Sequence, residues 1–260
     1  MIRLTRKKEE SKMAYKLKKK LANKKNYGSK RDLKSIKYIV IHYTAGDGDT
    51  DENNATYFAN NGNIGASAHY FVDDDSVTQS VPDNYVAWSV GGNKYSDCSK
   101  TGGGSLYAKC INQNSLSIEI CDAKKDGKIQ PLQATINNAI AFTKEKMAEY
   151  GIPQERVIRH FDVNGKKCPA YWCGTDAKDK KWLTEFWNKL IEFEPYLVKI
   201  TKKKVSIYSG AGTNNKVVGQ VEKGEVYTIV KDKKAGSQKW GKLKSGAGWI
   251  LLSGNTKEVK

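Results

Sequence analysis

The chain has 260 residues, 38% of them hydrophobic, and carries six tryptophans. A chain of this length forms one large domain with a small one, or two of moderate size. It contains no run of about 18 apolar residues, which argues against a membrane-spanning helix. The first 20 residues are basic and include no apolar segment, so we expect a protein made in the cytoplasm without a secretory signal.

The net charge of +17 is unevenly distributed along the chain. Residues 1–34 contain 14 Lys and Arg against 3 Asp and Glu, a charge of +11, and residues 198–260 contain 14 against 4, a charge of +10. Residues 35–197 contain 17 against 21, a charge of −4. Such basic flanks suit a polyanion, and charge alone leaves open a nucleic acid, an anionic membrane surface or a phosphate-rich wall polymer.

Hydrophobic patterning divides the chain into three parts. Residues 1–34 are lysine-rich with few apolar anchors, which predicts a solvated basic tail. Residues 35–197 mix short apolar runs with amphipathic segments, which predicts an α/β domain with a mixed central β-sheet flanked by helices. The predicted strands cover residues 38–43, 67–72, 76–81, 116–121 and 157–158. The predicted helices cover residues 131–150 and 182–191.

The sequence changes character after Pro195. Short β-rich runs separated by turn residues then follow one another, which predicts a small all-β barrel over residues 198–260. We place the boundary between the two domains near residues 195–200.

The five cysteines are Cys98, Cys110, Cys121, Cys168 and Cys173. An odd number, in a chain expected to lack a secretory signal, argues against a disulfide framework. Cys98 and Cys110 bracket glycine-rich residues and could pair in an oxidising space, the alternative being reduced thiols at the surface. Residues 91–104 contain five glycines, a composition more typical of a pocket rim than of a packed core.

Two of the three histidines follow separate β-rich runs. His42 lies near the end of the run 38–43, and His160 follows the strand predicted at 157–158. Cys168 comes eight residues after His160, and Gly165 between them permits the tight turn that brings both donors to one metal ion. Two His and one Cys are donors of a catalytic zinc, whose fourth position is left for water. Although a single histidine at a strand end is more often structural, this pattern predicts a zinc hydrolase with His42, His160 and Cys168 as ligands.

Two charged residues near these donors are candidates for catalysis. Glu119 is the one acid in an otherwise apolar strand; it either faces solvent at an edge or serves as a general base. Lys166 lies two residues before Cys168, and it is either a solvated surface lysine or a cation that stabilises an oxyanion.

Four segments match a known family: residues 41–45 (IHYTA), 66–70 (ASAHY), 117–121 (SIEIC) and 160–169 (HFDVNGKKCP). They resemble the type 2 N-acetylmuramoyl-L-alanine amidases, which are related to peptidoglycan recognition proteins and include many phage endolysins. The resemblance covers about residues 35–195. It implies zinc on His42, His160 and Cys168, a catalytic role for Glu119, and Lys166 at the oxyanion.

The resemblance also bears on His69. Some family members use a tyrosine just before the residue that matches His69, whereas this chain has Ala68 there. The chain therefore resembles the branch that uses the glutamate, and His69 is expected to line or support the substrate pocket.

The C-terminal part resembles a second family. Residues 209–213, 216–219 and 248–250 resemble landmarks of bacterial SH3-type domains, which commonly bind cell-wall peptide or glycan. Ile207 and Tyr208 before the first turn depart from the usual pattern and leave the ligand of this domain open.

These resemblances imply a zinc amidase that cleaves between the lactyl group of N-acetylmuramic acid and L-Ala of the stem peptide. The expected partners are bacterial peptidoglycan and anionic wall polymers, met after release from the cytoplasm and without stable membrane insertion. A phage endolysin fits this pattern, with a host autolysin or spore-cortex amidase as alternatives. A non-catalytic peptidoglycan-binding protein is disfavoured because all three predicted zinc ligands are present. Nucleic-acid binding is suggested by charge alone, and no zinc-finger, helix-turn-helix or aromatic RNA motif supports it.

Overall fold

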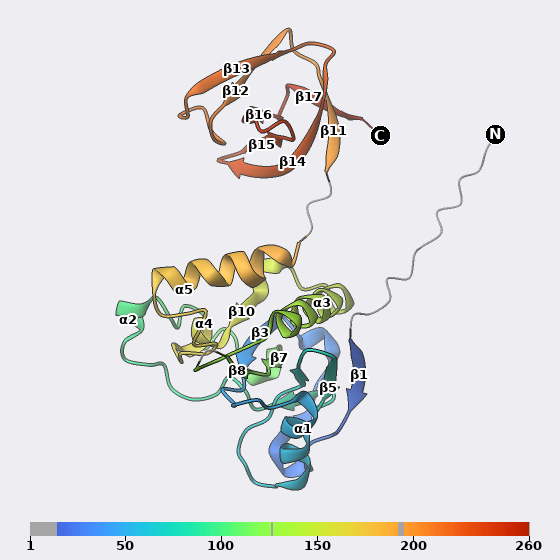
Figure 1. Cartoon of the computed structure of the whole chain (residues 1–260), viewed down its shortest axis with the longest axis vertical. Helices are drawn as coiled ribbons and strands as arrows, with labels where there is room; N and C mark the ends of the chain where they lie inside the picture. Colours follow the sequence, from blue (N-terminus) through green and yellow to red (C-terminus); the bar gives the residue numbers. More distant parts are fainter. Residues whose placement is uncertain (1–14, 126, 192–194, 260) are drawn as a thin grey trace, which may run out of the picture. The chain divides into compact units, whose positions relative to one another are not determined.

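The computed structural model describes residues 15–125, 127–191 and 195–259. The chain divides into two compact units, an N-terminal unit of residues 1–191 and a C-terminal unit of residues 192–260 (Figure 1). Within the described ranges, no helix combines the length and apolar character needed to cross a membrane.

A six-stranded sheet forms the centre of the N-terminal unit, in the order β1-β5-β4-β7-β3-β10. The strands are β1 (Lys16–Lys19), β3 (Tyr38–Tyr43), β4 (Tyr70–Val72), β5 (Ser76–Gln79), β7 (Ser115–Ile120) and β10 (Val157–Arg159). β4 and β5 form an antiparallel hairpin, and the other neighbouring pairs are parallel. The predicted α/β class, with a mixed central sheet, is confirmed.

Side-chain alternation gives the two faces of this sheet different roles. Ile41 of β3 and Ile118 of β7 pack in one apolar cluster with Ile136 and Ala139 of α3 (Gln133–Tyr150). Because successive strand residues point to opposite faces, the residues after Ile41 and Ile118 lie on the face away from α3. The sheet thereby separates its main core from the face that carries His42 and Glu119.

The other helical segments are short. They are α1 (Asp51–Asn60), α2 (Cys98–Thr101), α4 (His160–Asn164), α5 (Asp176–Lys181) and the 3-10 turns Lys24–Asn26, Leu33–Ser35, Asn112–Asn114 and Gln154–Arg156. The segment predicted as a helix over 182–191 begins earlier, with α5, and continues as a π-helical turn (Trp182–Phe186) and a 3-10 turn (Trp187–Lys189). Phe186 is fully buried, whereas Ile191, placed on the same stripe in sequence, is 53% exposed. The predicted apolar stripe is therefore only partly correct.

All five thiols are free and buried, so Cys98 and Cys110 are not paired, and the alternative of reduced surface thiols is right about the reduced state and wrong about the surface location. Cys98 is instead packed against the α4 end, where its Sγ lies 3.4 Å from the carbonyl oxygen of Asn164.

The start of the chain differs from the predicted basic tail over residues 1–34, of which residues 15–34 are described. β1 pairs in parallel with β5, and β2 (Tyr27–Lys30) pairs with β6 (Tyr85–Ala87). Tyr15 and Tyr27 are each 5% exposed. The tail prediction is wrong for this segment because a sheet edge offers backbone hydrogen bonds whatever the charge of the added strand, and composition does not reveal that edge.

The C-terminal unit is all-β, as predicted. Its antiparallel sheet has the order β13-β12-β16-β15-β14-β11-β17. The strands are β11 (Tyr196–Ile200), β12 (Lys204–Tyr208), β13 (Val217–Glu222), β14 (Val226–Ala235), β15 (Gln238–Leu243), β16 (Trp249–Leu251) and β17 (Thr256–Val259). Ile229, Trp240 and Ile250 are fully buried in it.

The remaining strands, β8 (Ala123–Lys125) and β9 (Lys128–Gln130), form a hairpin in the N-terminal unit.

A chain that starts at residue 35 should be less stable than one that starts at residue 15. It loses β1, β2 and the buried rings of Tyr15 and Tyr27. We expect the free energy of unfolding to fall by about 3 kcal/mol or more, since a buried aromatic side chain contributes about 1.5–3 kcal/mol. Urea unfolding of the two chains measures this, and equal midpoints would show that the segment is dispensable.

Candidate metal centre and substrate cleft

The parallel pairing of β3 and β7 places the first two candidate residues side by side. His42 is the register partner of Glu119 across the two strands. Both side chains lie on the face away from α3, with Nδ1 of His42 3.8 Å from Oε1 of Glu119. His42 is 2% exposed, and the Glu119 side chain is 19% exposed. Glu119 therefore does not face solvent at a sheet edge, which was its alternative role.

A tight turn returns the chain from His160 to Cys168. β10 pairs with β3 and ends at Arg159, so α4 begins with His160 beside His42. Gly165 ends α4 with a φ of +92°, and a Cβ at this position would lie 2.3 Å from Sγ of Cys98. The N–H of Phe161 then donates to the carbonyl of Cys168 at 3.0 Å, which closes the turn.

Arg159 holds this turn in place and was not found by sequence reasoning. Its guanidinium donates to Asp162 on α4 at 2.7 Å and to the carbonyl of Trp172 at 2.5 Å. It also pairs with Asp179 on α5. One buried cation thus joins the helix that starts with His160 to the segment that follows Cys168. In the sequence, Arg159 looks like an ordinary charged residue, and its position next to His160 does not reveal this role.

The three predicted ligands meet in a buried cluster. The donor atoms of His42, His160 and Cys168 all lie within 4.8 Å of one another. Sγ of Cys168 is 3.8 Å from Nδ1 of His42, and the ring centroids of His42 and His160 are 4.7 Å apart. Ligands of a tetrahedral zinc lie about 3.5 Å apart, given Zn–N of about 2.0–2.1 Å and Zn–S of about 2.3 Å. The donor set and its spacing therefore suit a metal ion.

The protonation states and unpaired atoms of the cluster also fit a metal ion. Burial lowers the pKa of His42 well below its usual value and lowers that of His160 to about 3, so both imidazoles are neutral at pH 7. Both ring nitrogens of His160 and Nε2 of His42 are buried without a hydrogen-bond partner among the described residues. Neutral imidazoles with unused nitrogens are available as ligands. Burial raises the pKa of the Cys168 thiol, so binding of a metal would displace its proton.

The environment of Glu119 suits exchange of a proton. Burial raises its pKa to about 8, an effect that the positive charge of Lys166 partly offsets. A carboxyl group with a pKa near neutrality can both accept and donate a proton at physiological pH.

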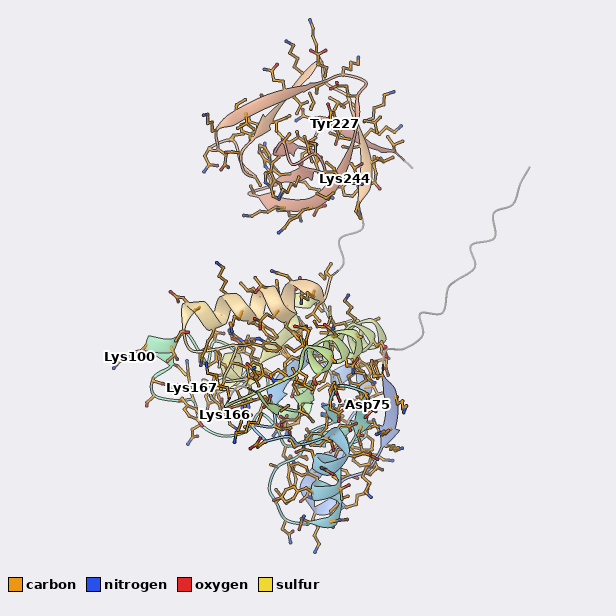
Figure 2. All side chains as sticks on the ribbon, in the orientation of Figure 1. Asp75, Lys100, Lys166, Lys167, Tyr227 and Lys244 are labelled. Carbon is orange, nitrogen blue, oxygen red and sulfur yellow. The ribbon has the colours of Figure 1, made fainter. Side chains whose placement is uncertain are left out.

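A cleft of about 790 Å³ opens beside the cluster, with His160 and Lys166 in its wall. Lys166 and its neighbour Lys167, both labelled in Figure 2, are exposed. Of the two, Lys166 lines the cleft. The remaining lining residues come from the segment between α1 and β4, from the loop after β6, from Asn112 and from the end of α4. They are Gly65, Ala66, Trp88, Ser89, Gly91, Gly92, Asn93, Lys94, Tyr95, Asn112 and Asn164. The glycine-rich residues 91–104 were expected at a pocket rim, and residues 91–95 of this segment line the cleft.

His69 is not among the residues that line this cleft. It is 1% exposed, and its Nδ1 accepts a hydrogen bond from the N–H of Ser117 at 3.0 Å. Its Nε2 lies 3.1 Å from the carbonyl oxygen of Tyr85 and 2.8 Å from Nη2 of Arg31. His69 therefore joins β7 to β6 and does not contribute to the lining of the cleft.

Comparison with known proteins places this geometry in a family. Residues 32–171 match the profile of the family described as N-acetylmuramoyl-L-alanine amidase (Amidase_2). The chain is 34% identical over 164 residues to the N-acetylmuramoyl-L-alanine amidase CwlL of Bacillus licheniformis, covering 61% of this chain and 41% of CwlL. It is 36% identical over 158 residues to CwlA of Bacillus subtilis strain 168, covering 60% of this chain and 52% of CwlA. The chain thus spans only about half the length of these relatives.

A solved structure agrees with the sequence comparison. The structure of PlyL is 26% identical and superposes with a TM-score of 0.52, covering 67% of this chain and 96% of PlyL. The matched residues 32–171 contain His42, Glu119, His160, Lys166 and Cys168. The chain belongs to the Amidase_2 family of N-acetylmuramoyl-L-alanine amidases.

Proposed function

We propose that the chain is a zinc-dependent N-acetylmuramoyl-L-alanine amidase. Its reaction is hydrolysis of the amide between the lactyl group of N-acetylmuramic acid and L-Ala of the stem peptide in bacterial peptidoglycan. The observation that carries the proposal is the cluster of His42, His160 and Cys168, with a carboxylate 3.8 Å from His42 and a cleft at His160. The family to which the chain belongs supports it.

The residues divide the work of an amide hydrolysis. Zinc held by the three donors would supply Lewis-acid chemistry, which lowers the pKa of water and polarises a carbonyl. Glu119 accepts a proton from the attacking water and then donates it to the nitrogen of the departing L-Ala. Lys166, which lines the cleft, stabilises the negative charge that develops on the carbonyl oxygen.

The biological setting that we propose is lysis of a bacterial wall by a phage endolysin. A host autolysin or spore-cortex amidase would use the same site. This alternative stays open because the relative CwlA is an N-acetylmuramoyl-L-alanine amidase of Bacillus subtilis. Digestion of purified walls, followed by mass spectrometry of the new ends, tests the reaction directly. Free L-Ala amino termini and intact glycan strands are expected, whereas new reducing sugar ends would refute the amidase assignment.

For the C-terminal unit we propose an SH3-like domain that binds the wall. Residues 198–260 carry 14 lysines against 4 acidic residues. The edge strand β13 exposes Val217 and Val218, each 49% accessible. A basic surface with exposed apolar residues suits an anionic polymer that carries peptide or sugar.

Cys168→Ser should lower metal content and activity together. The serine hydroxyl is a poorer zinc ligand than a thiolate, because soft sulfur donors suit zinc. Wild-type protein should hold about one zinc per chain, and a strong chelator should abolish wall lysis. Cys173→Ser is the matched control, since Cys173 is also buried but lies outside the donor cluster. Full activity of metal-free protein would refute the zinc site.

Glu119→Gln should retain zinc and lose turnover by about 10²–10⁴-fold, the usual contribution of a general base. Lys166→Met should also retain zinc, with a loss of about 10²–10³-fold in kcat, because it removes one oxyanion-stabilising group. Lys167→Met is the matched control, and we expect it to behave as wild type. Steady-state kinetics on a soluble muropeptide measures each value. A Glu119→Gln enzyme within about twofold of wild type would mean that another residue is the base.

A chain of residues 1–191 should cleave soluble muropeptides like the full chain but lyse intact walls poorly. All proposed catalytic residues lie within it, while the C-terminal lysines do not. Wall binding by the full chain should also weaken as salt rises from about 0.15 M to about 1 M, where the Debye length falls from about 8 Å to about 3 Å. Sedimentation with purified walls measures binding. Equal binding of both chains at physiological salt would contradict a targeting role for the C-terminal unit.

A further inference from the structure

One side chain of the N-terminal segment, that of Arg31, contacts a residue that lines the cleft. Residues 15–31 precede the part of the chain that matches the family profile. β2 ends at Lys30, and the next residue, Arg31, turns its guanidinium into the unit. Burial lowers the pKa of Arg31 to about 10, so it still carries its charge at neutral pH.

Arg31 binds backbone carbonyls from two separate segments. Its Nε donates to the carbonyl of Asp83 at 2.8 Å, in the connection between β5 and β6. Its Nη1 donates to the carbonyls of Ser115 at 2.6 Å and Asn112 at 3.3 Å, and it lies 3.4 Å from that of Gln113. A guanidinium suits this role because it has five donors in a rigid plane and no acceptor.

Asn112 connects Arg31 to the wall of the cleft through hydrogen bonds of its side chain. Its side-chain Oδ1 accepts hydrogen bonds from the N–H groups of Ser89 at 3.0 Å and Val90 at 2.9 Å. Ser89 and Asn112 both line the cleft, as do Trp88 and Gly91 on either side of the bonded amides. The carbonyl of Gly91 in turn accepts from Nδ2 of Asn164, which ends the helix that starts with His160.

We propose that Arg31 is a positioning residue for substrate binding, which fixes Asn112 and, through it, the wall formed by residues 88–92 of the cleft that His160 and Lys166 also line. The inference rests on the proposed amidase function. Arg31 does not act on the reacting atoms, since its hydrogen bonds go to none of the three candidate metal ligands. Its loss should therefore weaken substrate binding while the metal centre and the chemical step stay intact.

Arg31→Met keeps the aliphatic stem and removes the donors. We expect KM for a soluble muropeptide to rise by about tenfold, the scale of one lost charge-assisted hydrogen bond. The value of kcat should stay within about twofold, and zinc content should not change. Arg31→Lys should recover part of the loss. Arg156→Met is the matched control, because Arg156 is exposed and contacts the ring of Tyr38 rather than the cleft.

A double-mutant cycle separates positioning from a general loss of stability. Asn112→Ala should raise KM without changing kcat. Adding Arg31→Met to Asn112→Ala should change KM by a further factor of less than about two, because both residues act on the cleft through the hydrogen bonds from Asn112 to Ser89 and Val90. Independent, multiplied effects would overturn the proposal, as would a fall in kcat or zinc content with KM unchanged. If Arg31→Met does not fold, Arg31→Lys takes its place in the cycle with the same expected non-additivity.

Hydrogen exchange tests the same coupling without any substrate. In Arg31→Met the amides of Ser89 and Val90 should exchange faster than in wild type and in Arg156→Met, while the amides of β3 should not change. Unchanged exchange at Ser89 and Val90 would refute the link from Arg31 to the cleft wall. This result stands even if the wild-type chain cleaves no muropeptide, so failure of the proposed function would be recognised separately.

Discussion

The parallel register of β3 with β7 and β10 is the constraint on which the site depends. It sets His42 directly beside Glu119, and it ends β10 one residue before His160. Backbone hydrogen bonds fix this register, and a shift of one residue would send His42 to the face covered by α3. The apolar cluster beneath the sheet, which includes Ile41 and Ile118, makes such a shift costly. Packing on one face therefore determines chemistry on the other.

The third donor depends on a different device. Cys168 lies on no strand of the sheet, and its position comes from the turn that Gly165 permits and Arg159 fastens. Arg159 joins the segments before and after Cys168 by charge-assisted hydrogen bonds, which are stronger than neutral ones. The two histidines are thus set by strand pairing, and the thiol is set by a buried ion pair. Loss of the strand pairing or of the Arg159 contacts would move the donor atoms of the cluster apart without removing any of the three residues.

The wall of the cleft is held by polar contacts in addition to the burial of Val90 in a small apolar cluster. Asn112 and Asn164 bond the loop after β6 from two sides, and Arg31 anchors Asn112 from the N-terminal segment. Amide side chains suit this task because each can satisfy backbone donors and acceptors of an irregular loop. The cleft can therefore keep a polar lining without losing its shape. By this route a segment outside the family match contacts the residues that shape the cleft.

The sequence alone predicted the cluster of candidate metal donors and determined much of the fold. Two histidines after separate β-rich runs, a cysteine eight residues after one of them and a single acid in an apolar strand named the cluster, because strand ends and metal donors leave local signals. The α/β class and the all-β C-terminal unit also followed from local periodicity. Arg31 and Arg159 look like ordinary charged residues in the sequence, and β1 and β2 look like a solvated tail. Only the tertiary structure decided their roles, because those roles consist of contacts with carbonyls and a sheet edge far away in the chain.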